Sequence, residues 1–230
     1  MKRLLFLAIA GFAMVFASAQ RLENRSVSNF TGINASGAFE ITVVKSNSES
    51  LALEANDDVM PYIRSEVKNS VLHLYLDKNI PWKVRNRTVK ARIGMKNLDK
   101  VSLSGACEIS ASDLFTPETF NGNFSGASKI DVWINTEQLN LESSGASNIQ
   151  LKSSVAGTVK VDLSGSSKVY LSGSAKNLST DLSGASSFNA ENFEVETADI
   201  ESSGSSNVSI NVTQKLNIES SGASTVNYKG

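Results

Sequence analysis

A ten-residue pattern recurs through the second half of the chain. It reads LESSGASNIQ from Leu141 and returns as DLSGSSKVYL, DLSGASSFNA, ESSGSSNVSI and ESSGASTVNY. Its glycines, spaced by 21, 19, 20, 19, 20 and 18 residues, are Gly105, Gly126, Gly145, Gly165, Gly184, Gly204 and Gly222. A period near twenty indicates a solenoid, whose units bury their apolar faces only against their neighbours. The leucine–asparagine pattern of leucine-rich repeats is missing, so the spacing predicts an all-β fold, a parallel β-helix.

Apolar and polar side chains alternate on both sides of each glycine, which is typical of strands with one buried face. The residues four and six positions after the glycine should point inward, and they are Ile109, Ile130, Ile149, Val169, Phe188, Val208 and Val226, with Ala111, Val132, Leu151, Leu171, Ala190, Ile210 and Tyr228. Four residues before the glycine stand Val101, Leu141, Val161, Ile200 and Ile218, with Gly122 and Thr180 as exceptions. Each unit is therefore expected to hold two short strands and a less regular third side.

The glycines mark the corners between these strands. Glycine tolerates the positive φ and the close backbone approach that a bend requires. A serine precedes every one of them, from Ser104 to Ser221. In-register stacking is expected to join these hydroxyls to one another in a ladder. No base accompanies the serines, so a structural corner is favoured over a catalytic role.

The part of the chain before the repeats is less regular. Strands are expected at residues 39–44, 50–54, 71–76 and 90–95, and Ser36-Gly37-Ala38 resembles an early corner. We interpret residues 28–100 as wider first coils and a cap, and residues 101–230 as the regular repeats. Both parts would belong to one domain, residues 20–230.

The first 19 residues have the pattern of a Sec signal peptide. Lys2 and Arg3 precede the apolar run Leu4 to Phe16, and Ala17-Ser18-Ala19 supplies a cleavage site. The run is shorter than the ~20 residues of a spanning helix, so no transmembrane span is expected in a mature chain that begins at Gln20. The protein is expected in the periplasm, on the outer-membrane surface or outside the cell.

Charge and composition narrow the functional classes. The 22 basic and 23 acidic residues give a formal net charge of −1, which argues against nucleic acid as a partner. The single histidine, His73, should point away from the leucines of VLHLYL, and a surface role is favoured over that of a general base. The single cysteine, Cys107, occupies a serine position of the repeat and is interpreted as a small residue of the corner stack.

An acidic residue stands three positions before five successive glycines, at Glu142, Asp162, Asp181, Glu201 and Glu219. Stacking would place these carboxylates in a row about 5 Å apart, where they repel one another. Calcium could occupy such a row. However, the glycine-rich nonapeptide of calcium-binding β-rolls is absent, and a solvated face is favoured.

Two tryptophans could stack against sugars. Trp133 lies in a repeat, and Trp82 lies in the basic stretch PWKVRNRTVK, which could contact an anionic glycan. The alternative is a solvated edge without a ligand.

The stretch Phe30 to Val43, FTGINASGAFEITV, followed by the SGAS corners, resembles the head GIN domain of autotransporter adhesins. The triplet that names the family is present as Gly32-Ile33-Asn34. This former domain of unknown function is common in exported Bacteroidetes proteins. The resemblance spans nearly the whole mature chain and implies a right-handed β-helix outside the cytoplasm. It carries no catalytic residues, and no autotransporter barrel pattern follows the repeats.

These observations favour an exported, non-enzymatic β-solenoid that binds a glycan or a protein at the cell envelope, or supports the envelope. No catalytic, cofactor-binding or metal-binding residue is assigned. The alternative is a polysaccharide-active enzyme, but spacings of 18 to 21 residues leave little loop for a cleft. Only Thr225 to Gly230 follow the last corner. We expect either weak self-association there or a plug formed by Tyr228.

Overall fold

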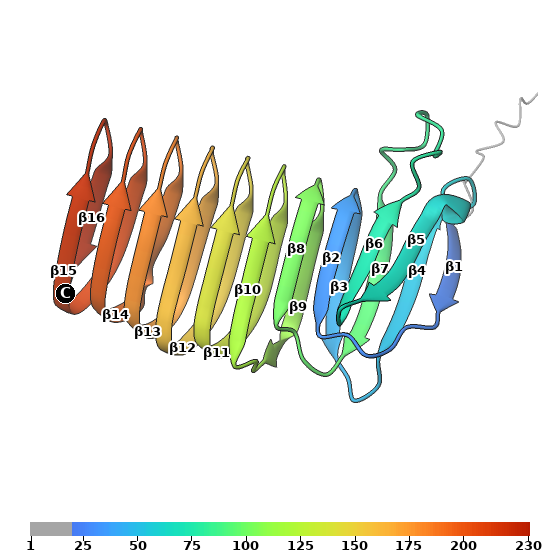
Figure 1. Cartoon of the computed structure of the whole chain (residues 1–230), viewed down its shortest axis with the longest axis horizontal. Helices are drawn as coiled ribbons and strands as arrows, with labels where there is room; N and C mark the ends of the chain where they lie inside the picture. Colours follow the sequence, from blue (N-terminus) through green and yellow to red (C-terminus); the bar gives the residue numbers. More distant parts are fainter. Residues whose placement is uncertain (1–19) are drawn as a thin grey trace, which may run out of the picture.

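Successive coils of the chain stack along one axis and pair mostly in parallel (Figure 1). The computed structural model describes residues 20–230. The predicted leader, residues 1–19, lies outside the described residues. The first elements are β1 (Gln20–Arg25), β2 (Gly32–Gly37), β3 (Phe39–Lys45), β4 (Ser50–Asn56), the 3-10 helix η1 (Met60–Tyr62), β5 (Ile63–Lys68), β6 (Val71–Leu76) and β7 (Val89–Met95). The repeats form β8 (Lys100–Gly105), β9 (Glu108–Phe115), β10 (Thr119–Phe124), β11 (Lys129–Ser143), β12 (Asn148–Leu163), β13 (Lys168–Leu182), β14 (Ser187–Ser202), β15 (Asn207–Ser220) and β16 (Thr225–Lys229). The predicted β-solenoid is confirmed.

Each coil has two faces that meet at the Ser-Gly corner. The strands that run into the corners form what we call the entry face: β5, β6, β2, β8, β10 and the second halves of β11 to β15. The strands that leave the corners form the exit face: β1, β4, β7, β3, β9, the first halves of β11 to β15, and β16. The apolar core lies between the two faces, because alternate side chains of both point toward the axis.

The predicted inward residues fill this core. Ile149, Leu151, Val169 and Leu171 are each 3% exposed or less, and the same positions are buried from Ile109 to Ile210. The pattern fails only in the last coil. There Val226 is partly buried and Tyr228 is 68% exposed, so Tyr228 does not form the predicted plug.

The expected third side takes another form. Opposite the corner, the coils of β11 to β15 each bend inside one long strand, whereas a short segment joins β9 to β10. The pairing register shifts near these bends, as between Thr136 and Gln138 of β11 and between Ser154 and Thr158 of β12. Extra residues in a strand bend it locally, which lets the chain pass from the exit face to the entry face without a loop.

The corner glycines stack as predicted, and Gly37 belongs to the same stack. All eight have φ between 73° and 123°, a region that L-residues rarely occupy. From Gly105 onward, an added Cβ would lie under 3 Å from the carbonyl oxygen of the glycine in the preceding coil. The residue after each glycine donates its N–H to that same oxygen at 2.7–2.8 Å. Glycine is therefore required both by its dihedral angle and by the stacking distance.

The serines bond differently from the expected ladder of hydroxyls. Ser125, Ser164, Ser183 and Ser203, each directly before a glycine, donate to main-chain carbonyls of the preceding coil at 3.3–3.5 Å. A second serine, two residues after the glycine, closes the turn by donating to the carbonyl three residues back. This bond spans 2.9–3.3 Å at Ser128, Ser167, Ser186, Ser206 and Ser224. The ladder prediction was wrong because carbonyls lie within reach of these short side chains.

Cys107 takes the place of this second serine, as predicted. It is 1% exposed, and its Sγ lies 3.3 Å from the carbonyl oxygen of Ser104. Burial raises the pKa of the Cys107 thiol, which disfavours the thiolate and with it a nucleophilic role.

The N-terminal end is closed by a cap that departs from the coil pattern. Wider first coils and a cap were predicted for residues 28–100. Strands β2, β3, β6 and β7 pair in parallel like the later coils, whereas β1 pairs antiparallel with β4, β4 with β7, and β5 with β6. Val59 and Met60, at 0% and 1% exposure, fill the interior at this end. The charged side chains of the edge strands β1 and β5 discourage pairing with another chain.

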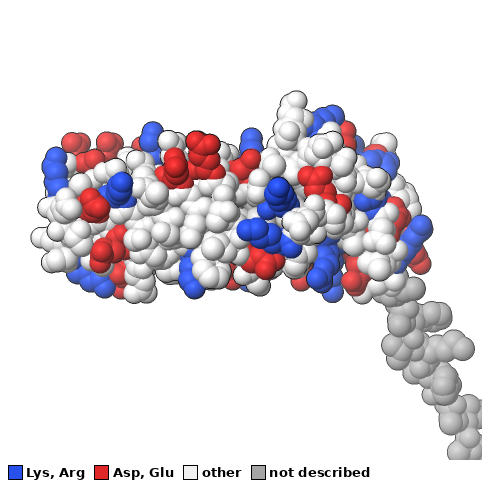
Figure 2. Space-filling view, turned by 90° about the horizontal axis from the view of Figure 1, so that it is seen from below, with Lys and Arg blue, Asp and Glu red and all other residues white. Residues whose placement is uncertain are grey.

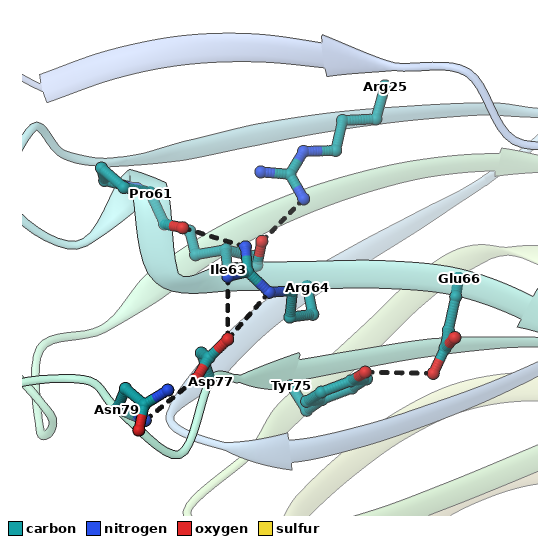
Figure 3. A network of polar contacts seen from close by, with 8 residues as sticks. All are labelled: Arg25, Pro61, Ile63, Arg64, Glu66, Tyr75, Asp77 and Asn79. Atoms are coloured by element: carbon teal, nitrogen blue, oxygen red, sulfur yellow. Dashed lines mark hydrogen bonds and ion pairs between the residues drawn. The ribbon is translucent and has the colours of Figure 1, made fainter.

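Polar contacts tie the cap strands together (Figure 3). Arg25 of β1 donates to the carbonyl of Ile63 at 2.8 Å, and Arg64 donates to the carboxylate of Asp77 at 2.8 and 3.1 Å. The backbone N–H of Asn79 and the Arg64 guanidinium hold the pKa of Asp77 below its usual range.

Candidate functional site

One outward position of every entry-face strand lines up across the whole solenoid. We call this line the polar row. In register, it runs through Glu66, His73, Asn34, Ser102, Asn123, Glu142, Asp162, Asp181, Glu201 and Glu219. The five acids therefore share one register, as predicted. The row continues through neutral residues to His73, whose neighbours Leu72 and Leu74 are fully buried, so its predicted orientation is also confirmed.

The triplet Gly32-Ile33-Asn34 lies on β2 in this face. Ile33 points into the core with 0% exposure, and Asn34 belongs to the polar row. Gly32 lies between Lys100 and Val71, and an added Cβ would come within 3.1 Å of a side-chain atom of each. The absence of a side chain at Gly32 thus lets the neighbouring strands approach beside Asn34.

Two hollows meet at Asn34 and together form what we call the entry groove. The first, of about 600 Å³, runs over the repeats and is lined by Ser102, Asn123, Glu142, Asp162 and Asp181, together with serines of the corners. The second, of about 760 Å³, lies toward the cap. Both hollows include Asn34 in their lining. The groove therefore crosses the strands and follows the solenoid axis.

The chemistry of the groove changes along its length. The cap-side hollow offers Lys68, Lys100 and His73, but also Asp99 and Glu118, so its charges nearly balance. Lys68 lies 2.8 Å from Glu66, and hydrogen bonds from Lys68 and then Tyr75 hold the pKa of Glu66 below its usual range. The hollow over the repeats is acidic. Amides and hydroxyls fill the middle, where they can donate and accept hydrogen bonds.

The five acids that the repeats contribute to the polar row, Glu142 to Glu219, make no ion pair within residues 20–230, unlike Glu66 at the cap end of the row. In the same part of the chain, no group of three or more His, Cys, Asp or Glu is arranged to hold a metal ion. Each strand contributes one carboxylate to the row, whereas calcium takes six to eight oxygens.

We therefore expect calcium at about 2 mM to shift the melting temperature by less than about 1 °C. Calcium bound with a dissociation constant above about 10 mM adds little to the free energy of unfolding at that concentration. Thermal unfolding followed by circular dichroism, with calcium and with EGTA, measures this shift. A rise of many degrees that is lost in the double variant Asp162→Asn and Asp181→Asn would establish a calcium site instead.

The two tryptophans lie on different elements. Trp82 is 80% exposed in the loop between β6 and β7, and Trp133 is 36% exposed on β11 in the exit face. Strands β3 and β9 lie between β7, which follows the loop of Trp82, and β11, which carries Trp133, so the two rings do not form one platform. The ammonium of Lys152 lies 4.3 Å from the centre of the Trp133 ring.

The basic stretch around Trp82 is partly neutralised by the cap. Arg87 pairs with Asp58 at 2.9 Å, and Lys90 lies 3.8 Å from Glu54. Two of the four basic residues of the stretch thus have acidic partners. Figure 2 views the molecule from below, and acidic and basic side chains are interspersed over that face.

The chain belongs to the family described as "Putative auto-transporter adhesin, head GIN domain", which matches residues 29–230. Solved structures share its fold. A "putative lipid binding protein" from Parabacteroides distasonis has a TM-score of 0.74 at 15% identity. Two proteins described as a "putative adhesin", from Parabacteroides merdae and Bacteroides fragilis, have TM-scores of 0.73 and 0.71 at 14% and 16% identity. Each alignment covers 93% of this chain and 98% of the other.

No curated protein matches the chain. Within residues 20–230, no helix has the length and apolar character needed to cross a membrane.

Proposed function

We propose that this chain is an exported, non-enzymatic, adhesin-like protein that binds a ligand of the cell envelope or of an external surface along its entry groove. The observation that carries the proposal is the groove itself. It crosses the strands on either side of Asn34 and offers in-register side chains in every coil that it spans. An extended glycan or protein segment along the axis would meet one polar side chain of the row at each coil, about 4.8 Å apart.

Membership of the adhesin head family and the solved relatives described as adhesins support this proposal. We also propose that residues 1–19 direct export and are removed, and that residues 20–230 act as one domain. In the alternative of a polysaccharide-active enzyme, neighbouring carboxylates such as Glu142 and Asp162 would cleave the bound polymer.

Binding and cleavage can be separated with one set of variants. Purified protein should be retained by at least one ligand of a glycan array or of a panel of immobilised collagen, laminin, fibronectin and mucin. A triple variant, Glu142→Gln, Asp162→Asn and Asp181→Asn, should lose at least about tenfold in affinity, whereas the wild type should release no shorter saccharides from the ligand.

The matched control is Glu201→Gln with Glu219→Gln, which neutralises acids of the same row outside the lining of the groove. If the triple variant is retained as strongly as the wild type, the groove is not the binding surface. Release of shorter saccharides by the wild type, abolished in the triple variant, would favour the enzyme.

A further inference from the structure

The exit face carries a separate hollow of about 440 Å³ where β12, β13 and β14 lie side by side. Two outward rows of side chains surround it. One row runs in register through Asp131, Gln150, Tyr170 and Asn189, and the adjacent row runs through Trp133, Lys152, Ser172 and Asn192. The small Ser172 stands among larger neighbours in the second row, which leaves a depression beside the Tyr170 ring.

A β-bulge deepens one side of this hollow. Between β13 and β14 the register passes from Tyr170 paired with Asn189 to Ser172 paired with Asn192, so two residues of β14 oppose Leu171. Ala190 of this pair is buried, and Glu191 is the exposed extra residue. The backbone N–H of Glu191 donates to the side-chain oxygen of Asn189 at 3.2 Å. Bulges re-aim side chains in this way, and here the bulge places a carboxylate in the lining of the hollow.

The lining combines an aromatic ring with many hydrogen-bonding groups. Tyr170 is 42% exposed and offers a flat, amphipathic surface. The amides of Gln150, Asn189 and Asn192 can both donate and accept, the carboxylates of Asp131 and Glu191 accept, and the ammonium of Lys152 donates. Such a set matches a ligand that has an apolar ring face and several hydroxyl groups around its edge.

We propose that this hollow, which we call the Tyr170 hollow, binds a neutral pyranose residue of an oligosaccharide, with the sugar stacked against Tyr170 and its hydroxyls bonded to the amides and carboxylates. Two carboxylates against one ammonium leave the lining with a formal charge of −1, which disfavours uronates, sulfated sugars and nucleotides. A peptide strand has no place to pair here, because the backbone of β13 is already paired on both sides.

Trp133 serves as a reporter of this hollow. Its ring lies under the Lys152 ammonium, and Lys152 lines the hollow, so a bound sugar that moves Lys152 changes the surroundings of the indole. The chain has two tryptophans, and the other, Trp82, lies in the cap loop. The two indole N–H signals of the 15N-labelled protein thus provide a signal beside the hollow and an internal reference, and the variant Trp133→Phe assigns them.

The test is a titration of the protein with lactose, cellobiose, maltotriose and N,N′-diacetylchitobiose, with a trigalacturonate as the acidic comparison. At least one neutral saccharide should move the Trp133 signal saturably and leave the Trp82 signal in place. Tyr170→Ala should weaken this binding at least about tenfold, and Tyr170→Phe, which keeps the ring, should change it by less than about threefold. Gln150→Ala, which removes one of the amides that line the hollow, should also weaken it.

The matched control is Tyr228→Ala, which removes another exposed tyrosine, on β16, and should leave the affinity unchanged. The proposal is overturned if no neutral saccharide moves the Trp133 signal, if Tyr170→Ala binds as tightly as the wild type, or if trigalacturonate alone binds. The Tyr170 hollow and the entry groove lie on opposite faces. Failure here would therefore leave the groove variants and their ligand unaffected, and the two proposals can fail separately.

Discussion

Replacement of Gly165 by valine is expected to lower the free energy of unfolding by about 3 kcal/mol or more, from the combined strain and lost hydrogen bonding. Gly165 has φ 77°, where a β-branched residue is strained, and an added Cβ would lie 2.6 Å from the carbonyl oxygen of Gly145. That oxygen also accepts the N–H of Ser166 at 2.7 Å. The valine must push the two coils apart and break this bond. Chemical denaturation followed by circular dichroism measures the change.

The neighbouring substitution Ser166→Ala is the matched control. Ser166 is exposed and contributes its backbone N–H to the corner, which alanine retains. It should change the stability by less than about 0.5 kcal/mol. A Gly165→Val variant as stable as the wild type would show that the corners do not stack at this distance.

Replacement of Ile149 by aspartate should have a comparable or larger effect. Ile149 is 0% exposed and lies in register between Ile130 and Val169, so a carboxylate there has no partner and no access to water. A buried, unpaired charge costs several kcal/mol, and we expect the central coils to unfold or the protein to become insoluble. Hydrogen exchange measured by mass spectrometry should show loss of protection that is centred on β11 to β13.

Gln150→Asp is the control one residue away. Gln150 occupies an outward position between Asp131 and Tyr170, and its substitution introduces the same charge into solvent. It should retain wild-type protection throughout the solenoid. A soluble, fully protected Ile149→Asp variant would contradict the assignment of Ile149 to the core.

The regular half of the fold could be predicted because two signals coincide there. The glycine spacing fixes which residues of successive coils lie side by side, and the alternation around each glycine fixes which of them point inward. One of the two exceptions also has a physical reason. Gly122 stands at an inward position because a Cβ there would lie 2.8 Å from the Phe124 ring. A large side chain at one position of a coil is balanced by the absence of one at its neighbour.

The pairing of the cap strands and the two proposed binding surfaces could not be predicted from these two signals. The antiparallel strands β1, β4 and β5 lack the corner glycine, so nothing in their sequence shows which strands they pair with. The acidic row was found because the same charge type repeats. By contrast, Asn34 and the Tyr170 hollow depend on dissimilar residues that adjoin only after stacking. Alignment of all outward positions by coil would have brought Gln150, Tyr170 and Asn189 together.

The Ser-Gly corner also determines how this protein could change in length. At every corner from Gly105 onward, the residue after the glycine donates its backbone N–H to the carbonyl oxygen of the glycine in the preceding coil. This bond does not depend on the side chains of either coil. Removal of one whole coil, for example residues 146–165, would bring Gly145 directly under Gly184 and join strands of matching register. The cross-section would stay constant while the molecule became shorter by one strand spacing, about 4.8 Å. Duplication or loss of coils could thus alter the reach of the entry face and leave the cap unchanged.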